Sequence, residues 1–363
     1  MHLLVVNLGS SSLKLRLLDP ADRVVADAHL PVPVDPGAVE RFLRGSVEPA
    51  AIAHRVVHGG ERFRGPTLVD DAVLHALDEL SVLAPLHNPP TVELIRHLAT
   101  LLPGMPAVAC FDTAYHASMP SAATTYAVPA TWRERSGIRR YGFHGLSHAH
   151  ASRRVAELLG RPLEQLSVIT CHLGAGASLA AIEGGRSVDT TMGFTPLEGL
   201  VMATRSGDID PAAVLWLQQR AGLSADEVGD ALNHRSGLLA LAGTPDLRVI
   251  LTRARSGDPQ AASAVDVYVH RLVKGIAAMR ASLARFDALV FTGGVGENAS
   301  EIRAMACARL GFLGLPEVLD EPDGDTVVSP EGSTVAVAVV AAREDLEMAR
   351  QARSVLTGVT TGG

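Results

Sequence analysis

The chain has 363 residues, which is long for a single hydrophobic core and suits two domains. Hydrophobic residues make up 47% and charged residues 20%, a balance typical of a packed globular protein and not of a disordered one. The net charge of −7 is spread along the chain and only 4% of residues are aromatic, so the sequence indicates neither a basic face nor a stacking surface for nucleic acid.

The sequence also lacks the signals of a membrane or secreted protein. Its longest apolar run, residues 335–342, is far short of the ~20 residues that a membrane span needs. Residues 1–7 have no basic segment and become polar too early for a signal peptide. Cys110, Cys171 and Cys307 lie far apart and match no metal spacing, so we expect reduced, buried thiols. A cytoplasmic protein is therefore expected.

The chain opens with a strand pattern that recurs later. Residues 3–6 and 13–18 flank Gly9 and three serines, which predicts a β-hairpin. Residues 167–171 and 178–182 flank a second glycine-rich turn in the same way. A strand, turn and returning strand that occur twice suggest a duplicated domain.

Between and after these hairpins the sequence predicts both helices and strands. Residues 146–159 show a helical pattern that Gly160 and Pro162 stop. Asp210 and Pro211 are typical capping and first-turn residues of a further helix. The remaining predicted elements are a capping box at Ser224 and Glu227, a long helix over 259–286, a strand over 288–292, a turn over 293–296, a helix capped by Asn298 and Glu301, a strand over 334–340 and a final helix over 344–355.

Three glycine-rich turns each follow a predicted strand, at residues 7–12, 172–178 and 293–298. Glycine lets the backbone approach an anion closely, and successive N–H groups can form a concave donor site. These turns therefore predict phosphate binding, although no Walker loop is present. Residues 294–299 also fit the G-x-G-x-x-A form of a dinucleotide fold, but outside its usual N-terminal βαβ unit, so that alternative stays open.

Several cationic or titratable side chains lie beside turns. Arg55 and Arg205 each occupy a short segment rich in glycine or small residues, where a guanidinium can grip a carboxylate or phosphate with two hydrogen bonds. Lys14, one of only two lysines, follows the first glycine turn. His87 and His144 lie in similar turn-like, partly apolar segments. These residue types suit an anionic substrate.

A histidine group gives a second open alternative. His144, His148 and His150 could suggest a zinc site. The first two have i,i+4 spacing, but this places them on one face only if a helix already covers Gly145, which we do not expect.

One series of motifs runs nearly the length of the chain. It comprises residues 7–14, 54–63, 85–90, 111–116, 141–148, 172–178, 189–211 and 291–298. The most specific part is Asp189 to Leu200, which reads Asp-Thr-Thr-Met-Gly-Phe-Thr-Pro-Leu-Glu-Gly-Leu. In content and order this series resembles the acetate kinase family.

The resemblance implies an α/β fold of two duplicated ribonuclease H-like domains, of the actin-like ATPase type, around a nucleotide cleft. Residues 1–115 with 346–363 would form the N-terminal domain, and residues 116–345 a C-terminal domain with the nucleotide and dimer contacts. The resemblance also implies a homodimer that uses Mg²⁺, with Mn²⁺ as a substitute. The reaction would be reversible, direct in-line transfer of the ATP γ-phosphoryl group to the carboxylate of acetate, giving acetyl phosphate and ADP.

The resemblance also assigns roles to residues. Those implied in catalysis are Arg55, Asp112, His144 and Arg205, with His87 as further support for the transition state. The acid pocket would consist of Arg55, Val57, Leu86, Phe143 and Pro196. Asn7 and Glu344 would support the metal ion. The nucleotide would contact Ser12, Lys14, His172, Gly174, Gly176, Asp246, Leu247, Arg248, Gly294, Val295, Gly296, Glu297 and Asn298.

The chain departs from the family pattern mainly on the nucleotide side. Ala175 stands where the family usually has asparagine, and Leu8 replaces a small polar residue. Leu146 replaces a threonine, Leu247 an aromatic residue, and residues 341–345 differ from a Thr-Asn-Glu-Glu type of run. We therefore expect carboxylate chemistry to be retained while ATP affinity or donor choice has changed.

Two other functions remain as alternatives. One is a kinase for propionate or another short-chain acid, or a member with a different phosphoryl donor. The other is an actin-like, ATP-dependent binding module without transfer activity. Arg55, His144 and Arg205 argue against the module, because it has no use for an acid pocket.

Overall fold

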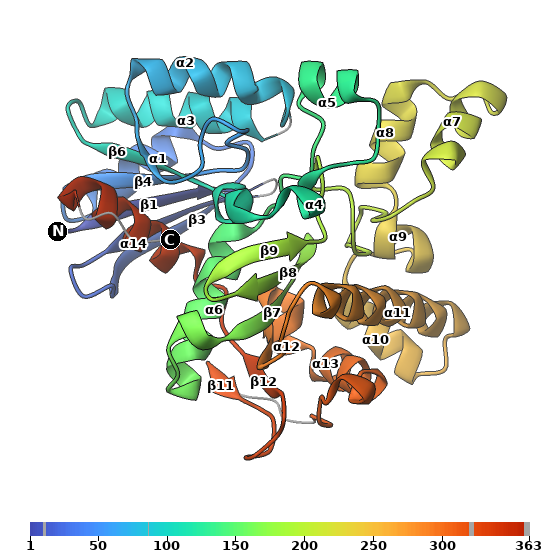
Figure 1. Ribbon diagram of the computed structural model, residues 1–363. Coiled ribbons are helices and arrows are strands. Elements are labelled where there is room, and N and C mark those ends of the chain that lie inside the picture. Colours follow the sequence, from blue (N-terminus) through green and yellow to red (C-terminus); the bar gives the residue numbers. More distant parts are fainter. Residues whose placement is uncertain (10–11, 86, 319–322, 359–363) are drawn as a thin grey trace. The chain divides into compact units, whose positions relative to one another are not determined.

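The computed structural model describes residues 1–9, 12–85, 87–318 and 323–358, which divide into two compact units (Figure 1). Unit 1 comprises residues 1–117 and 143–150 and the chain from residue 343 on. Unit 2 comprises residues 118–142 and 151–342. Within the described ranges, no helix combines the length and apolar character needed to cross a membrane.

Unit 1 is a six-stranded sheet covered by helices on both faces. Its strands are β1 Leu3–Leu8, β2 Ser12–Leu18, β3 Val24–Pro31, β4 Ala51–Val56, β5 Thr67–Leu68 and β6 Ala107–Phe111. Its helices are α1 Pro36–Arg44, α2 Asp71–Glu79, η1 Leu80–Val82, α3 Asn88–Leu101, η2 Ala114–Ser118 and α14 Glu344–Thr357, together with the start of α6 Gly145–Leu159.

The central strand β1 is apolar at consecutive positions because both faces of the sheet are covered. Leu3 and Val5 pack into a cluster with α14, whereas Leu4 and Val6 pack into a cluster with α1 and α3. Successive side chains of a strand point to opposite faces, so a sheet covered on both sides needs an unbroken apolar run. Figure 1 shows α14 running along this sheet, far in sequence from β1.

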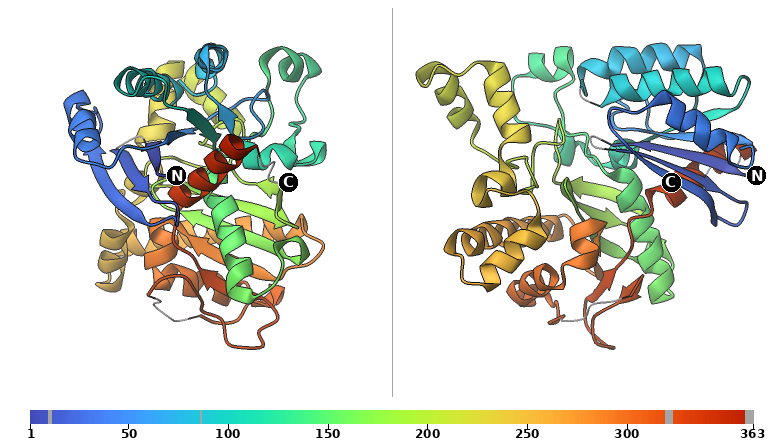
Figure 2. Two further views of the ribbon diagram at one scale, coloured as in Figure 1. Left: turned by 90° about the vertical axis from the view of Figure 1, so that its left-hand side faces the viewer. Right: turned by 180° about the vertical axis from the view of Figure 1, so that it is seen from behind.

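Unit 2 is built on a second six-stranded sheet. Its strands are β7 Ser167–Leu173, β8 Ala177–Glu183, β9 Arg186–Thr190, β10 Ala288–Thr292, β11 Thr326–Val327 and β12 Ala336–Val339. Its helices are α4 Ser121–Thr124, α5 Ala130–Ser136, α6 Gly145–Leu159, η3 Leu163–Gln165, α7 Pro211–Arg220, α8 Ala225–His234, α9 Gly237–Ala242, α10 Leu247–Arg255, α11 Pro259–Ala281, α12 Gly293–Asn298, α13 Ser300–Arg309 and η4 Gly311–Leu313. Helices α10 and α11 pack side by side (Figures 1 and 2).

The two sheets have the same topology. The strand order is β3-β2-β1-β4-β6-β5 in unit 1 and β9-β8-β7-β10-β12-β11 in unit 2. In each sheet an antiparallel meander of three strands joins two parallel strands, and a short antiparallel strand closes the edge. The predicted duplication and α/β fold class are confirmed.

The segment after β10 differs from its prediction. The expected turn over residues 293–296 is the first part of α12. Gly293 makes the turn alone, with a φ of 79°, so the helix begins at once. Asn298 does not cap α13, because its side chain donates to the carbonyl of Gly294 (2.9 Å) and thus ends α12. Helix α13 follows Ala299 without a side-chain cap.

Three other boundaries also differ. Helix α11 ends at Ala281, capped by Ser282, and does not extend to residue 286. Strand β12 covers 336–339, less than the expected range. Helix α6 begins at Gly145, so the helix that the His144–His148 spacing requires is present, contrary to our expectation. The amide of His148 donates to the carbonyl of His144 (3.0 Å), which closes the first turn.

His54 in β4 makes the stability of the protein sensitive to acid. The residue is 1% exposed, and neither ring nitrogen has a hydrogen-bond partner among the described residues. Burial lowers the pKa of His54 from 6.5 to about 3. Between these values the unfolded chain binds a proton that the folded chain rejects, so stability falls as the pH falls, by about 1.4 kcal/mol per pH unit for one such group. Above pH 6.5 this contribution is constant.

We expect a His54→Asn variant to lose part of this acid sensitivity. The urea midpoint of unfolding should depend less steeply on pH between 6 and 4 than in the unsubstituted protein, whatever the change in absolute stability. His75→Asn, which replaces a side chain that is 78% exposed, serves as the control and should keep the original slope. Equal slopes for the His54 variant and the unsubstituted protein would contradict the prediction.

Candidate active site

Arg55 and Asp112 form a buried ion pair at one edge of the unit 1 sheet. Strands β4 and β6 are parallel neighbours, and the two residues lie at or just beyond their carboxyl ends. Nε and Nη2 of Arg55 donate to the Asp112 carboxylate at 3.2, 3.2 and 2.6 Å. The side chains are 14% and 1% exposed. Such a forked pair fixes the guanidinium in one orientation.

The charges in this pair stabilise one another. Burial opposes the positive charge of Arg55, but the charges of Asp112 and Glu344 outweigh it and raise the pKa of the guanidinium. Burial raises the pKa of the Asp112 carboxyl, and Arg55 opposes that shift. Arg55 is thus a permanent cation, and its remaining N–H group can serve another partner.

That remaining group connects Arg55 to the two residues predicted to support a metal ion. Nη1 of Arg55 donates to Oδ1 of Asn7 (3.1 Å), and Nδ2 of Asn7 donates to the Glu344 carboxylate (2.7 Å). Asn7 comes from β1 and Glu344 is the first residue of α14. The fold therefore brings together four predicted residues from four separate segments.

Glu344 is held in place by its neighbour in the chain. Asp345 is 7% exposed and accepts hydrogen bonds from Arg343 (2.8 and 2.9 Å) and from Arg16 of β2 (2.9 Å). Both acidic residues lie in the first turn of α14, where the helix dipole favours negative charge. The start of α14 is consequently fixed against β2.

His144 lies against Asp112 in an unusual backbone conformation. Its φ is 57°, in the left-handed region that costs a residue with a side chain free energy. The amide of Gly145 donates to the Asp112 carbonyl (3.0 Å), and a Cβ atom at Gly145 would overlap that oxygen. The glycine is thus required by the close approach of two backbones, which fixes His144 at the start of α6.

Phe143 brings in two histidines that the sequence reasoning missed. The Phe143 ring is 1% exposed and packs edge-on against His58, with ring centroids 5.5 Å apart. Nε2 of His116 lies 3.0 Å from the carbonyl oxygen of Phe143. Both histidines occur within motifs quoted above, but nothing in their spacing assigns them this supporting role.

The other residues predicted in unit 1 lie on or beside its strands and helices, or outside the described residues. Val57 is 6% exposed and follows β4 directly, while His87 precedes α3. Lys14 is opposite Asn7 in the β1–β2 ladder, so both side chains lie on the same face of the unit 1 sheet. The carbonyl of Ser12 accepts from the amide of Gly9 (2.8 Å). Leu86 lies outside the described residues.

Arg205 in unit 2 is a partly buried cation without an acidic partner among the described residues. Nη1 donates to the backbone carbonyl of Pro196 (2.7 Å), and this is the one hydrogen bond of the guanidinium within the described ranges. Burial lowers the pKa of Arg205 from its usual value. A desolvated guanidinium with free N–H groups suits a carboxylate or phosphoryl oxygen.

Two of the predicted nucleotide segments meet at one edge of the unit 2 sheet. His172 on β7 is paired with Thr292 at the end of parallel β10, and α12 packs on β7. The amide of Gly174 donates to the Gly176 carbonyl (3.0 Å), which shapes the β7–β8 turn. A Cβ atom at Gly293 would overlap the backbone of Leu173. Ligands of open α/β sheets bind at such edges, outside the carboxyl ends of parallel strands.

Helix α12 is itself braced. Arg303 is 1% exposed and donates to the carbonyls of Gly296 (3.0 Å) and Glu297 (2.8 Å). The Glu297 side chain accepts from the amide of Ala342 (3.0 Å). Gly294, Val295 and Asn298, the other predicted residues here, lie on the same helix.

The third predicted nucleotide segment of unit 2 lies at the start of α10, a helix that packs on α11. Asp246 caps α10 by accepting from the amide of Arg248 (2.9 Å), whose guanidinium also pairs with it. Hydrogen bonds from Arg248 lower the pKa of Asp246 to about 2. Leu247 is 5% exposed and packs into the core.

Comparison with known proteins decides the family. The sequence model of the acetokinase family matches residues 38–350. The chain belongs to the acetokinase family. An acetate kinase from Streptomyces griseus subsp. griseus is 46% identical, with the match covering 96% of this chain and 95% of that protein.

Solved structures of the family have the same fold. The acetate kinase of Porphyromonas gingivalis superimposes with a TM-score of 0.90 at 35% identity, covering 98% of this chain and 99% of that chain. A propionate kinase from Francisella tularensis subsp. tularensis gives a TM-score of 0.89, also at 35% identity, covering 96% of this chain and 98% of that chain. The fold alone therefore does not distinguish an acetate kinase from a propionate kinase.

The residues that depart from the acetokinase pattern are compatible with the fold. Ala175 is exposed at the tip of the β7–β8 turn, and its carbonyl accepts from the amide of Ala203 (3.1 Å). Leu8 packs partly against the unit 1 core. Leu146 is fully buried beside β1 and α14. Leu8 and Leu146 are therefore packed in the core of unit 1, while Ala175 has no side-chain donor for a phosphate.

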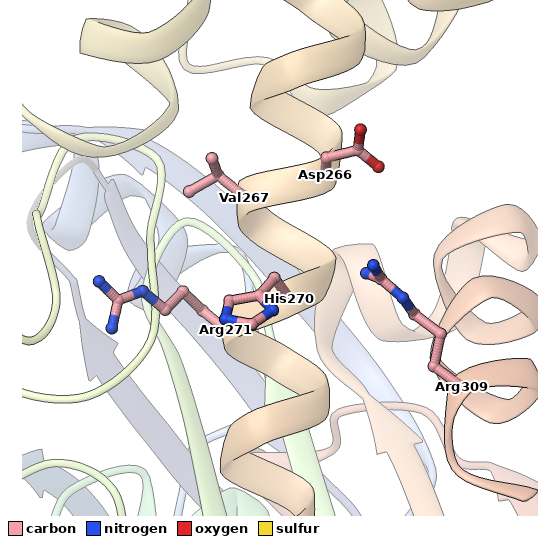
Figure 3. Close-up of a pocket in the computed structure, with 5 residues that line it drawn as sticks. All are labelled: Asp266, Val267, His270, Arg271 and Arg309. Carbon is pink, nitrogen blue, oxygen red and sulfur yellow. The ribbon is translucent and has the colours of Figure 1, made fainter.

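A surface hollow in unit 2 contains none of the predicted residues. It is lined by Asp266, Val267, His270 and Arg271 of α11 and by Arg309 of α13 (Figure 3). Figure 3 shows Asp266 and Arg309 on the side between the two helices, with the Arg271 side chain directed away from them. These side chains do not converge on one point, so the acetokinase residues above remain the candidate site.

Proposed function

We propose that this chain catalyses reversible transfer of the γ-phosphoryl group of ATP to acetate, giving acetyl phosphate and ADP. The observation that carries the proposal is the set of partners and the burial of two guanidinium groups. Arg55 is oriented by a buried carboxylate, and Arg205 is partly buried with one backbone partner in the described chain. Membership of the acetokinase family supports the same reaction.

The chemistry requires positive charge and positioning more than proton transfer. Acetate is ionised at neutral pH, so its oxygen can attack without a general base. A bond forms between that oxygen and the γ-phosphorus as the bond to the β–γ bridging oxygen breaks, and ADP leaves with the electron pair. The obstacle is repulsion between the carboxylate and the triphosphate, which cationic side chains reduce.

Membership of the acetokinase family, together with the Arg55–Asp112 pair, supports a division of roles. Arg55 and Arg205 would bind the acetate carboxylate and the transferred phosphoryl group, and His144 with His87 would contact the equatorial oxygens. Asp112 would orient Arg55. Phe143, Val57, Pro196 and Leu86 would form the apolar pocket for the methyl group, and the glycine segments of unit 2, with Asp246–Arg248, Ser12 and Lys14, would bind ATP.

Asn7 and Glu344 suit a magnesium ion that is bound chiefly through water and phosphate. Magnesium prefers oxygen ligands and commonly uses one or two carboxylates together with substrate phosphates. The pair offers the amide oxygen of Asn7 and the Glu344 carboxylate, and Nδ2 of Asn7 donates to that carboxylate (2.7 Å). Among the described residues, no group of three or more His, Cys, Asp or Glu side chains forms a denser metal site. The ion, or Mn²⁺ in its place, would supply positive charge to the phosphates.

A hydroxamate assay for acyl phosphates tests the function and its specificity. We expect product with ATP and acetate, and a kcat/KM for propionate that is lower by about 10–200-fold, because one methylene in a fitted pocket is worth about 1–3 kcal/mol. Assays with GTP and pyrophosphate test whether the exposed Ala175 accompanies a change of donor. No acyl phosphate with any combination of donor and acid would contradict the proposal.

We also propose that the protein is a cytoplasmic homodimer. Helix α7 supports self-association, because none of its residues is buried, and Leu215 and Trp216 are 54% and 60% exposed. Exposed apolar side chains of this size are typical of protein interfaces. Sedimentation of the purified protein measures the oligomeric state.

A further inference from the structure

Tyr126, Arg140 and Glu198 form a closed cluster in unit 2 that the proposed mechanism does not use. The Tyr126 hydroxyl donates to one Glu198 oxygen through a very short hydrogen bond, and Nη2 of Arg140 donates to the other (2.5 Å). The Arg140 guanidinium also lies over the Tyr126 ring, 5.6 Å from its centroid. Arg140 and Glu198 are 17% and 33% exposed. Each member therefore contacts the other two.

This cluster holds both ends of one loop, residues 191–199. At the first end, Nη1 of Arg140 donates to the Thr191 carbonyl (2.9 Å), and the amide of Phe194 donates to the Tyr126 hydroxyl (3.1 Å). At the second end, Glu198 is itself a loop residue, and Tyr126 and Arg140 hold its carboxylate. A Cβ atom at Gly193 would overlap the Glu198 carboxylate and the Tyr126 hydroxyl, so the loop fits against the cluster without spare room.

The loop in turn determines where Arg205 is held. Pro196 lies in the middle of the loop, between the two ends that the cluster fixes, and its carbonyl accepts the hydrogen bond from Arg205 (2.7 Å). The base of the loop is tied to the Arg205 segment by Gly199 and Asp208, which exchange hydrogen bonds of 2.8 and 3.0 Å. A displaced loop would thus displace the only partner of the Arg205 guanidinium within the described residues.

We propose that Tyr126, Arg140 and Glu198 are positioning residues that set the place of Arg205 through the Pro196 carbonyl. This inference rests on the proposed function only for its effect on the reaction. The proposed mechanism gives the clamp, as we call these three residues, no contact with either substrate. Its role is to keep the guanidinium where the carboxylate and phosphoryl oxygens meet it, and a displacement of about 1 Å can cost on the order of 10²-fold in rate.

The first measurement is a double-mutant cycle on Tyr126→Phe, which removes one hydroxyl and keeps the ring. We expect kcat/KM for acetate to fall by about 10–100-fold, while the KM for ATP changes by less than about 3-fold. In an Arg205→Lys background the same substitution should cost less than about 3-fold, because the group that the clamp positions is already lost. Equal losses in both backgrounds, or no loss in either, would overturn the proposal.

The second measurement does not depend on activity. Amide hydrogen exchange of residues 191–199 should be faster in Tyr126→Phe than in the unsubstituted protein, because the loop loses two of its anchors. Tyr268→Phe is the matched control, since it removes a buried hydroxyl of unit 2 that has no hydrogen-bond partner among the described residues. Unchanged exchange in Tyr126→Phe would refute the clamp even if the protein makes acetyl phosphate. Faster exchange in a protein that makes none would instead refute the proposed function.

Discussion

An Arg205→Ala variant is expected to lose about 10³–10⁵-fold in kcat for acetyl phosphate formation, the range found for an arginine that stabilises a phosphoryl-transfer transition state. The guanidinium is desolvated, has no acidic partner among the described residues, and is held only by the Pro196 carbonyl there. No acidic side chain among the described residues therefore neutralises its charge. Steady-state assays with acetate and ATP at saturation measure the loss.

The same variant should remain folded. Removing Arg205 leaves no buried carboxylate without a partner, and burial already disfavours its charge. We expect a melting temperature within a few degrees of the original, as is usual when no buried charge is orphaned. Arg309→Ala is the matched control, because this exposed arginine has no ion-pair partner among the described residues; its kcat should change less than about 2-fold. A kcat for Arg205→Ala close to the control would remove Arg205 from the mechanism.

The second large effect is expected for Asp112→Asn, which should reduce both activity and stability. The carboxylate accepts three contacts from Arg55 and is 1% exposed, so its neutralisation leaves a buried guanidinium poorly compensated. Breaking such a pair typically costs about 3–5 kcal/mol. The freed Arg55 should also move, with a loss in kcat on the order of 10²-fold. Urea denaturation and the acyl phosphate assay measure the two effects.

A compensating variant separates the two effects. Arg55→Met combined with Asp112→Leu removes both charges, and such replacements often restore stability or improve it. We expect the urea midpoint to recover while activity stays lost. Asp78→Asn, in a pair with Arg96 whose side chains are 45% and 48% exposed, is the control and should cost at most about 1 kcal/mol. Recovery of activity in the double variant would show that the ion pair serves only the fold.

Local signals in the sequence predicted much of the fold. The capping box at Ser224 and Glu227 and the cap at Asp210 are present as expected, because these contacts involve residues three or fewer positions apart. The repeated strand–turn–strand unit predicted the duplication that the two sheets show. Helix α12 was missed because glycines at 293, 294 and 296 are also typical of turns, and only tertiary packing on β7 distinguishes the two.

The site was predictable by residue type and less so by contact. The motifs predicted Arg55, Asp112, Asn7 and Glu344 singly, but their hydrogen bonds span 57, 48 and 337 positions, which no periodicity reveals. The clamp was missed for the same reason, since Tyr126 and Glu198 are 72 positions apart. The interpretation that Asp112 orients an arginine or a Mg²⁺-bound water stays a prediction until the variants are measured.

The most direct test of the central claim follows the oxygen that attacks phosphorus. The purified protein is incubated with ATP, magnesium and acetate labelled with ¹⁸O in both carboxylate oxygens, and the product is observed by ³¹P NMR. Direct transfer to the carboxylate predicts ADP and acetyl phosphate in equal amounts, with an isotope shift from one ¹⁸O on the acetyl phosphate phosphorus. ATP hydrolysis without acetyl phosphate, or acetyl phosphate whose phosphorus has no ¹⁸O neighbour, would contradict the mechanism.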